Sequence, residues 1–290
     1  MAILVDKRTR VLVQGITGRI GSFQTKLMIE YGTNVVAGVT PGKGGQTIHG
    51  VPVFDSVLQA VKDTKPDVSI CFVPGPYACD AAMEAIDAGL RLEVVLAEAV
   101  PLPDAVKMVA FASARKAFII GPDTAGIISP GSAKLGVHPH RLFSEGRIGI
   151  VSRSGALSYE TAKVLTENGL GQSTVVGVGG GPVWGLTHRD ALEMFRADRA
   201  TDAVVLLGEI GGHIEEEAAE YISTGFPKPV VALVVGRAAP PGQKMGHAGA
   251  IIERGRGSAQ DKIVALKRAG AIVAHSPREI ASIMRNELKF

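Results

Sequence analysis

His247 is the side chain of this sequence that is best placed to do chemistry. It stands in a run of mostly small residues from Gly242 to Ala250, inside a stretch, 236–258, that is rich in glycine, proline and basic residues. This composition predicts a long loop, and long ordered loops in compact domains usually serve a function. An accessible neutral imidazole is a nucleophile and titrates near neutral pH. An ordinary loop histidine fits the segment equally well, so the rest of the chain has to decide.

Glu209 is a carboxylate that could work with this histidine. It lies in the run Gly208–Gly212, directly after an apolar run, 203–207, that is typical of a strand. A lone carboxylate among glycines at a strand end is placed to hold a ligand or to accept a hydrogen bond from a histidine. A plain loop glutamate is the alternative. The nearby run Glu215–Glu217 is expected to be a solvated first helical turn, which the helix dipole favours, rather than a metal site.

A candidate anion site follows another apolar run, 148–151, and precedes a helix-like stretch, 156–168. The residues between them are Ser152, Arg153, Ser154 and Gly155. Hydroxyl groups, a guanidinium and the free N–H groups of a helix start can together bind an anion. Capping of the helix by Ser152 or Ser154 is the alternative.

A second anion-binding motif is a glycine-rich turn near the N-terminus. The apolar run 10–14 ends at Gly15, and the residues up to Gly21 open a helix-like stretch that continues to about Tyr31. Strand, glycine turn and helix in this order form a phosphate cradle, because backbone N–H groups and the helix dipole face the anion. The spacing is GxxGxxG rather than the GxGxxG of dinucleotide sites, so the pattern alone is weakly specific.

Lys43 narrows the class of nucleotide. A NAD site has an acidic residue at the end of its second strand, which binds the ribose hydroxyls. Here the predicted strand 34–39 runs into a turn, 40–45, that offers a cation instead. This favours a ligand with an additional ribose phosphate, such as coenzyme A or NADP. A solvated turn lysine is the alternative, and the spacing excludes a Walker A loop.

These motifs fall on alternating strand-like and helix-like stretches. In the first half, further strands are expected at 67–73, 93–97 and 117–120, and helices at 77–89 and 102–116. This alternation is typical of a doubly wound parallel sheet, in which ligands bind beyond the carboxyl ends of the strands. Four residues lie at such ends, so one crevice could hold one ligand: Thr17, Lys43, Pro74 and Glu98.

The second half repeats the alternation. Further strands are expected at 174–178 and 230–235, and helices at 191–196 and 214–223. Residues 123–146 carry several glycines and prolines and are predicted to be an irregular connection. The predicted fold class is therefore α/β with two doubly wound domains, 1–122 and 147–290, joined by 123–146.

Composition limits the class of protein. A chain of 290 residues with 46% hydrophobic and 20% charged residues can form two well-buried α/β domains. The net charge of +3 comes without a long Lys/Arg run, which disfavours nucleic acid and suits a small anionic ligand. The spacing of Cys71 and Cys79 favours a reducing, cytoplasmic setting. We expect no signal peptide, no membrane span and, from the arrangement of His138 and His140, no metal site.

Five motifs resemble those of the succinyl-CoA synthetase (succinate–CoA ligase) α-subunit family, in the NDP-forming acyl-CoA synthetase superfamily. They are GITGRIG at 15–21, VTPGKGG at 39–45, IVSRSG with SYE between 150 and 160, GEIGG at 208–212 and GHAGAI at 246–251. The likeness covers the whole chain. It implies a CoA-binding Rossmann domain followed by a flavodoxin-like ligase domain.

The resemblance also implies roles for single residues. His247 would carry a phosphoryl group as a phosphohistidine, supported by Glu209, and the helix start at Ser154-Gly155 would hold the transferred phosphoryl group. Tyr159 would lie near the acid substrate. The residues that would bind CoA are Thr17, Gly18, Arg19, Ile20, Lys43, Leu96, Ala97 and Glu98.

A partner chain is implied as well. This sequence has no nucleoside-triphosphate loop of its own, and in the family an ATP-grasp β subunit binds ATP or GTP with Mg²⁺. The implied enzyme is a cytoplasmic heterodimer or heterotetramer of the tricarboxylic acid cycle. It makes acyl-CoA from a small carboxylic acid, CoA and a nucleoside triphosphate, and its glycine loop would let His247 travel between sites.

Several positions depart from the family pattern. Where succinate enzymes usually read GPNCPG and GGDP, this chain has GPDTAG at 121–126 and GGGP at 179–182. The changed residues are Asp123, Thr124, Ala125 and Gly181, and Ala97 and Ala156 replace threonines. The acid therefore stays open between succinate, the family default, and malate, citrate or another acid. A non-catalytic CoA-binding regulatory protein and an NADP-dependent reductase are the other classes considered, and neither needs the histidine loop.

Overall fold

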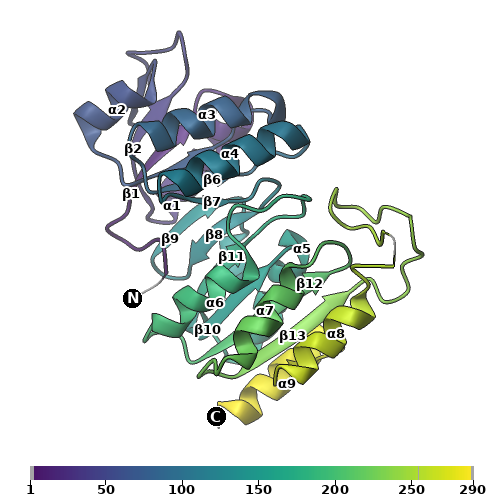
Figure 1. The fold of residues 1–290 in the computed structure, drawn as a ribbon. Helices are drawn as coiled ribbons and strands as arrows, with labels where there is room; N and C mark the ends of the chain where they lie inside the picture. Colours follow the sequence, from purple (N-terminus) through teal and green to yellow (C-terminus); the bar gives the residue numbers. More distant parts are fainter. Residues whose placement is uncertain (1–2, 254, 289–290) are drawn as a thin grey trace.

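Two α/β domains follow each other in the computed structural model, which describes residues 3–253 and 255–288. Each is built on a seven-stranded sheet with helices on both faces. Figure 1 shows the first domain in purple and blue and the second in teal, green and yellow, with a long loop projecting beside their junction. The predicted α/β class with two domains is confirmed.

The first sheet has the strand order of a Rossmann fold. Its strands are β1 (Arg10–Gln14), β2 (Asn34–Val39), β3 (Thr47–Ile48), β4 (Val51–Phe54), β5 (Val68–Cys71), β6 (Leu92–Val95) and β7 (Phe118–Ile120). They are arranged β3-β4-β2-β1-β5-β6-β7, and only β3 runs antiparallel to its neighbour. The helices are α1 (Arg19–Glu30), α2 (Val57–Thr64), α3 (Gly75–Asp87) and α4 (Leu102–Ala114). Without the short β3, this is the order in which a dinucleotide fold binds its ligand beside the first strand.

The glycine turn between β1 and α1 folds tightly for a steric reason. β1 is central, and its residues Val11, Leu12 and Val13 are fully buried. The chain must reverse at once into α1, so backbone passes close to backbone. A Cβ added to Gly21 would lie 2.2 Å from the carbonyl oxygen of Gly15. Only glycine fits there, which leaves the N–H groups of the turn close to the helix start.

The second sheet has flavodoxin-like order with an added hairpin. Its parallel strands are β10 (Glu145–Ser152), β11 (Gln172–Gly177), β12 (Ala203–Glu209), β13 (Val230–Val235) and β14 (Ile272–Val273), in the order β14-β13-β12-β10-β11. The helices are α5 (Gly155–Glu167), α6 (His188–Ala197), α7 (Ile214–Ser223), α8 (Ala259–Arg268) and α9 (Pro277–Glu287). This order is the second common doubly wound arrangement, with its reversal between β10 and β12. The flavodoxin-like expectation is confirmed.

The prediction that residues 123–146 form an irregular connection is wrong. They contain β8 (Gly126–Ser129) and β9 (Ala133–Gly136), an antiparallel hairpin followed by a 3₁₀ turn, η1 (His140–Leu142). β8 pairs with β11, so the hairpin extends the second sheet. Both strands are short and buried on both faces, and their few residues lie between glycine and proline turns. That leaves too little periodicity to distinguish strand from loop.

The two domains share buried contacts. The hydroxyl of Thr33, in the first domain, donates to the carbonyl of Lys134 at 3.0 Å, and the hydroxyl of Ser129 donates to the carbonyl of Val5 at 3.2 Å. One apolar cluster runs through both domains, from Val13 to Val151. The hairpin therefore joins the second sheet and packs against the first domain, which fixes the two strand-end sites relative to each other.

Candidate active site

Each domain places a helix start at the reversal point of its sheet. In the first domain this is the turn 15–21 between β1 and α1, beside the segment that follows β5. In the second it is the run 152–155 between β10 and α5, beside Glu209 at the end of β12. Ligands of doubly wound folds bind at such points because the carboxyl ends of the strands diverge there. The long loop that follows β13 reaches the second point with its residues 247–249.

His247 and Glu209 meet although they are far apart in the sequence. Nδ1 of His247 lies 2.9 Å from Oε1 and 2.8 Å from Oε2 of Glu209. A carboxylate can only accept, so Nδ1 carries the proton and the lone pair is on Nε2. Hydrogen bonding to Glu209 raises the pKa of His247 above its ordinary value, against the opposing effect of burial. The structure thus presents a histidine whose free nitrogen is Nε2.

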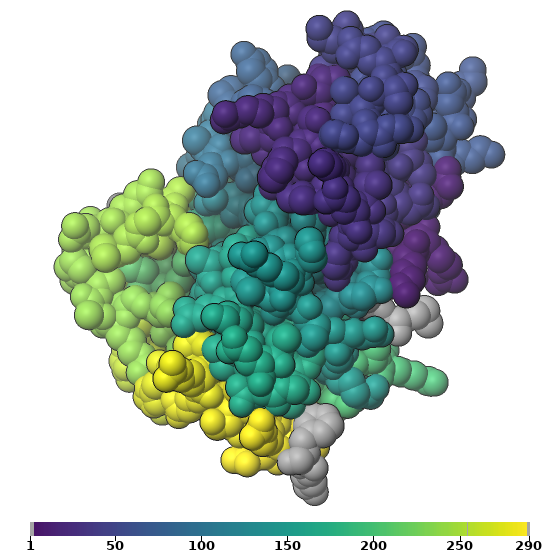
Figure 2. Space-filling view, turned by 180° about the vertical axis from the view of Figure 1, so that it is seen from behind, coloured from purple at the N-terminus to yellow at the C-terminus, as the bar shows by residue number. Residues whose placement is uncertain are grey.

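The histidine loop is anchored close to the ring. The N–H of Gly249 donates to the carbonyl of Gly180 at 2.9 Å, and the N–H of Met245 donates to the carbonyl of Ala250 at 2.9 Å. The ring packs directly on Gly180, where an added Cβ would lie 2.4 Å from Cγ of His247. The side chain keeps 33% of its surface exposed. The sequence suggested an unshielded ring, whereas the structure covers one face and one edge. Figure 2 shows the loop, in yellow-green, as a lobe at the side of the molecule.

Arg153 lies beneath the site rather than in it. Its side chain is fully buried, and Nη2 contacts Oε1 of Glu209 at 3.2 Å. Nη1 donates to the carbonyl oxygen of Gly211 at 2.7 Å. The expectation that Arg153 offers a free cation to a substrate or phosphate does not fit this geometry, because its charge is directed at buried protein groups. It contacts Glu209 directly, and its charge lowers the pKa of His247.

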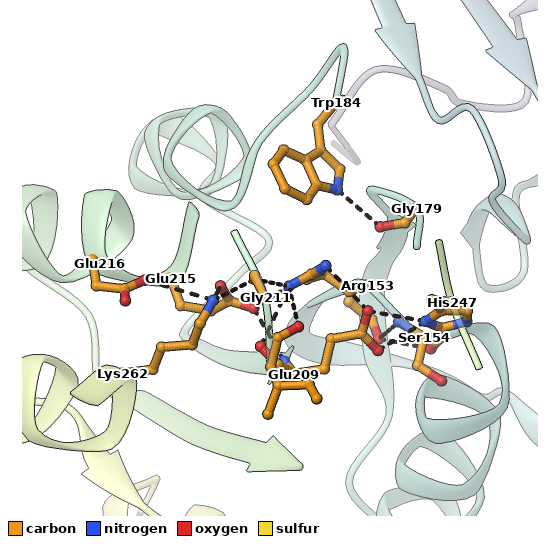
Figure 3. Close-up of polar contacts among 12 residues, drawn as sticks. Arg153, Ser154, Gly179, Trp184, Glu209, Gly211, Glu215, Glu216, His247 and Lys262 are labelled. Atoms are coloured by element: carbon orange, nitrogen blue, oxygen red, sulfur yellow. Dashed lines mark hydrogen bonds and ion pairs between the residues drawn. The ribbon is translucent and has the colours of Figure 1, made fainter. Parts of the chain in front are cut away.

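The start of α5 shows the capping role that the sequence left open and keeps a place for an anion. The hydroxyl of Ser154 caps the helix by accepting from the N–H of Leu157 at 3.3 Å, and Ser152 bonds the backbone of Ser154. The first N–H groups of a helix have no partner inside it, so capping leaves donors at Gly155 available to an anion. The hydroxyl of Tyr159 also reaches Gly155, where an added Cβ would lie 3.4 Å away. Figure 3 places Ser154 beside the Glu209–His247 pair.

Three of the positions that depart from the family pattern line a cavity beside the histidine loop. Asp123 and Gly181 border a cavity of about 200 Å³ together with Ala97 of the first domain and Ala248 of the histidine loop. Burial raises the pKa of Asp123, and the nearby His247 opposes this. Thr124 is used structurally, since its hydroxyl donates to the carbonyl of Gly177 at 2.6 Å. Ala125 packs near Gly155, and Ala156 is exposed in the first turn of α5.

The first domain contains the larger cleft, with a volume of about 650 Å³. It is lined by Thr17, Gly18, Arg19 and Ile20 of the glycine turn and by Pro74 after β5. Sequence reasoning missed other lining residues, among them Thr40, Phe72, Tyr77 and Glu84. Tyr77 is 66% exposed at the start of α3. An exposed aromatic ring directly after Pro-Gly-Pro at a strand end was the available signal.

The remaining predicted ligand residues lie at the edges of this cleft. Lys43 is exposed, three residues beyond Thr40 in the same turn. The segment Leu96–Glu98 does not line the cleft but adjoins it, since a Cβ on Gly75 would lie 2.5 Å from the carbonyl oxygen of Glu98. Ala97 instead faces the smaller cavity beside His247. The sequence predicted a single crevice. The structure instead has a cleft and a smaller cavity, and the segment Leu96–Glu98 lies between them.

The expectation of a solvated Glu215–Glu217 turn is wrong for Glu215. This residue is fully buried and pairs with Arg153 and with Lys262 of α8. The signal was present in the sequence: Glu215 shares the buried face of α7 with Ile214, Ala218 and Ile222. Lys262 likewise lies on the buried face of α8, beside Ala259 and Ile263.

Two further findings concern metals and membranes. Among residues 3–253 and 255–288, no group of three or more His, Cys, Asp or Glu side chains is arranged to hold a metal ion. Within the same residues, no helix has both the length and the apolar character needed to cross a bilayer.

Comparison with known proteins gives one consistent result. Residues 6–99 match the model of the CoA binding domain, and residues 151–272 match that of the CoA-ligase domain. The chain is 54% identical to the α subunit of succinate–CoA ligase [ADP-forming] of Aquifex aeolicus, covering 100% of this chain and 95% of that protein. It is 53% identical to the corresponding α subunit 1 of Archaeoglobus fulgidus, over 100% and 99%.

A solved structure shares the whole arrangement. ATP citrate lyase from Methanothrix soehngenii, in complex with citrate and coenzyme A, matches with a TM-score of 0.89 at 25% identity. The match covers 98% of this chain and 51% of that one, so this chain spans about half the length of that protein. Full-length identity above half to the relatives named above decides the family: the chain belongs to the α subunits of succinate–CoA ligase, the succinyl-CoA synthetases.

Proposed function

We propose that this chain is the α subunit of an NDP-forming acid–CoA ligase, most simply succinate–CoA ligase. The reaction joins a carboxylic acid to CoA at the expense of ATP or GTP and passes through phospho-His247. The observation that carries the proposal is the pair His247–Glu209, with Nδ1 bound to the carboxylate at 2.8 Å and Nε2 left free.

The chemistry follows from that tautomer. Nε2 attacks the terminal phosphorus of the nucleotide, and the bond to the leaving diphosphate breaks. The phosphoryl group then passes to a carboxylate oxygen of the acid, and Nε2 regains its lone pair. The CoA thiol attacks the resulting acyl phosphate, loses its proton and displaces inorganic phosphate. During these steps Glu209 keeps the proton on Nδ1, and the start of α5 supplies N–H donors to the phosphoryl group.

CoA fits the first domain. The cleft of about 650 Å³ is lined by the glycine turn, whose backbone N–H groups and helix start can hold phosphates, and by the exposed ring of Tyr77. We assign Thr17, Gly18, Arg19 and Ile20 to its phosphates, and Lys43 to the additional ribose phosphate. Leu96, Ala97 and Glu98, between cleft and cavity, would line the route of the thiol arm to His247.

The nucleotide is assigned to a partner. We expect an ATP-grasp β subunit to bind ATP or GTP with Mg²⁺ and to form a heterodimer or heterotetramer with this chain in the cytoplasm. The names of the relatives support a second subunit, since they are α subunits. The exposed edge of His247 is the surface that such a partner would have to reach.

The direct test is transfer of label to the histidine. The chain is mixed with a β partner and ATP labelled at the terminal phosphate, and the protein is then examined for acid-labile, base-stable label. We expect label on the native chain and none on His247→Asn. The matched control is His213→Asn, because His213 also contacts a glutamate, Glu217, at 3.0 Å but is exposed on the surface. Label that persists in His247→Asn refutes the proposal.

The identity of the acid is tested separately. The relatives' names support succinate, while the likeness to a protein solved with citrate makes citrate the first competitor. Asp123 and Gly181 in the cavity beside His247 are the positions that would accommodate a hydroxylated or larger acid. We expect the highest kcat/KM with succinate in the reconstituted pair. A higher value with malate or citrate would replace the substrate and keep the mechanism.

Equilibrium binding distinguishes the other classes of function. A ligase of this kind binds CoA and not NADPH. Tight NADPH binding with hydride transfer would indicate a reductase. CoA binding without any labelling of His247, in the presence of a competent partner, would indicate a regulatory protein.

A further inference from the structure

A row of charged side chains runs from the interior of the second domain to His247. Figure 3 shows it in the order Lys262, Glu215, Arg153, Glu209 and His247, with alternating sign. The side chains of Lys262, Glu215 and Arg153 are fully buried, and that of Glu209 is 8% exposed. None of the first three was part of the reaction described above.

The links of the row are direct contacts. Nζ of Lys262 pairs with Oε2 of Glu215, and Oε1 of Glu215 lies 3.4 Å from Nη1 of Arg153. Nη2 of Arg153 lies 3.2 Å from Oε1 of Glu209. Arg153 therefore stands between two carboxylates, and Glu215 stands between two cations.

The same groups also fix the backbone that carries Glu209. Oε1 of Glu215 accepts from the N–H of Glu209 at 3.1 Å. The carbonyl of Gly211 accepts from Nη1 of Arg153 at 2.7 Å and from Nζ of Lys262 at 2.8 Å. Both the main chain and the carboxylate of Glu209 are thus held from the interior. On the other side, among the residues that the structure describes, the carboxylate is held by His247 alone.

We propose that Lys262, Glu215 and Arg153 are positioning residues that hold the Glu209 carboxylate against Nδ1 of His247. Lys262 acts at the greatest distance: it satisfies Glu215, so that Arg153 remains directed at Glu209. The contacts are observed whatever the chain does, but the reason for holding Glu209 against His247 rests on the proposed function.

Stability alone gives no reason for this arrangement. A buried ion pair is weak evidence for stability, because the desolvation of its charges offsets the attraction, and apolar replacements are often neutral or stabilising. What the row provides is geometry. Trp184 closes it from above, with its ring centroid 5.0 Å from Cζ of Arg153 and its Nε1 donating to the carbonyl of Gly179. The guanidinium is confined between this ring and the carbonyls of the Glu209 turn.

Other charged groups near the row help to determine whether the pKa of His247 rises or falls when the row is altered. His247 faces Glu209, Asp123 and Arg153, and Lys244 lies near Asp123. Glu215 faces Arg153, Lys262 and His188, and Glu216 lies beside Lys262 at 3.6 Å. His188 is neutral at pH 7, because burial lowers its pKa to about 4. Neutralising Lys262 and Glu215 together removes one charge of each sign, so the net charge near His247 is kept while the ion pair behind Arg153 is lost.

The test compares a single variant with a double one. In Lys262→Met, Glu215 loses its cation and draws Arg153 away from Glu209. The carboxylate beside His247 is then less neutralised, so the pKa of His247 rises by roughly half a unit to one unit. In Glu215→Gln/Lys262→Met, Arg153 has only Glu209 to pair with, and the pKa of His247 falls below that of the native chain.

The readout is an NMR titration of the His247 imidazole in the 290-residue chain, assigned with His247→Asn. A merely structural role would shift both variants in one direction or neither, and either result overturns the proposal. Urea denaturation checks that each variant is folded. If Lys262→Met does not fold, the double variant decides: a lowered pKa supports the proposal, and an unchanged or raised one overturns it.

Controls separate this inference from the proposed function. Arg147 and Asp202 form an exposed ion pair at the other end of the sheet, and Arg147→Gln/Asp202→Asn should leave the titration of His247 unchanged. Failure of the native chain to accept label from ATP would refute the ligase function and leave the titration result intact. Opposite shifts of the His247 pKa in the two variants, together with normal labelling of the native chain, support both the positioning role and the ligase function.

Discussion

The two strand-to-helix turns at 15–21 and 152–155 hold the same place in their domains and differ in what lies beneath them. Both connect a buried strand to a helix at the reversal point of a parallel sheet, and both contain an arginine. Arg19 of the first turn is exposed at the mouth of a wide cleft, whereas Arg153 of the second is buried among carboxylates and carbonyls. The first turn presents backbone donors to a ligand and needs little else from its side chains.

The difference separates binding from chemistry. A site that only binds an anion can rely on N–H groups and a helix dipole, which need no charged support. A site that forms a covalent bond on a histidine must keep one tautomer and one carboxylate orientation through several steps. The second turn carries a buried guanidinium that is held from several sides. Under the proposed function, the stability of this turn and its chemistry should depend on the same residue.

The largest expected effect is the difference in the free energy of unfolding between variants of the two arginines. Arg153→Met leaves Glu209 and Glu215 without their shared cation in a buried site, so we expect the free energy of unfolding to fall by about 3–5 kcal/mol. Arg19→Met removes an exposed charge and should change it by less than about 0.5 kcal/mol. Urea denaturation of both variants measures the contrast. Equal effects would mean that the two turns are supported alike.

The second prediction replaces one glycine at each site with alanine. Each replacement should impair one activity, phosphorylation or CoA binding, and leave the other unchanged. A Cβ on Gly180 would lie 2.4 Å from Cγ of His247, and a Cβ on Gly21 would lie 2.2 Å from the carbonyl oxygen of Gly15. Gly180→Ala should slow phosphorylation roughly tenfold to a hundredfold and leave CoA binding unchanged. Gly21→Ala should weaken CoA binding by a similar factor and leave phosphorylation unchanged. Labelling and CoA titration on both variants test this, and a variant that loses both activities would contradict it.

The third prediction uses pH. The pKa of His247 is raised chiefly by its hydrogen bond to Glu209, so phosphorylation should decline as the pH falls through that raised value and the ring takes a second proton. In Glu209→Gln the raising contribution is lost while burial and Arg153 still lower the pKa. The acid limb of the pH–rate profile should move down by roughly one unit, and the plateau should fall about tenfold because the tautomer is held less firmly.

A matched control exists for this profile. Glu217 contacts the exposed His213 on the surface of α7, and Glu217→Gln should leave both the limb and the plateau in place. An unmoved limb in Glu209→Gln would show that the carboxylate does not set the protonation of His247.

Much of the fold could be predicted because its signals are local. Apolar runs that lead into turns rich in small or polar residues predicted β1, β2, β10, β12 and β13, and the alternation with helices predicted the parallel sheets. What the sequence did not reveal was short or marginal: the β8–β9 hairpin, β3, β4 and β14, and the helices α2, α8 and α9. The hairpin is buried on both faces and so shows no alternation. Helices α8 and α9 follow the long loop and were not assigned, although their buried faces are periodic.

The candidate site also has features that the sequence predicted and features that it did not. Residue type and strand-end position made Glu209 a candidate partner of a histidine, with a plain loop glutamate as the alternative, and the family resemblance assigned it to His247. The burial of Arg153 was not, since a guanidinium beside hydroxyls at a helix start has the same sequence whether it faces a ligand or the interior. Glu215 and Lys262 required a comparison of helix faces across 47 residues of sequence separation. Charge type alone assigns such residues to the surface.

The smallest effect is expected at Lys43, the exposed cation of the first domain. If it binds the additional ribose phosphate of CoA, Lys43→Ala removes one solvent-screened charge pair, worth up to about 1 kcal/mol, and weakens CoA binding by roughly twofold to fivefold. The loss should vanish for dephospho-CoA, which lacks that phosphate, and should shrink at high salt because exposed pairs are screened. Lys62→Ala, an exposed lysine on α2, is the control and should change neither affinity. Titration calorimetry with CoA and dephospho-CoA at two salt concentrations gives the answer.

Equal losses for both ligands would place Lys43 on another part of CoA. A larger loss than predicted would show that even the open turn uses a partly buried charge, and the contrast between the two turns would then be one of degree.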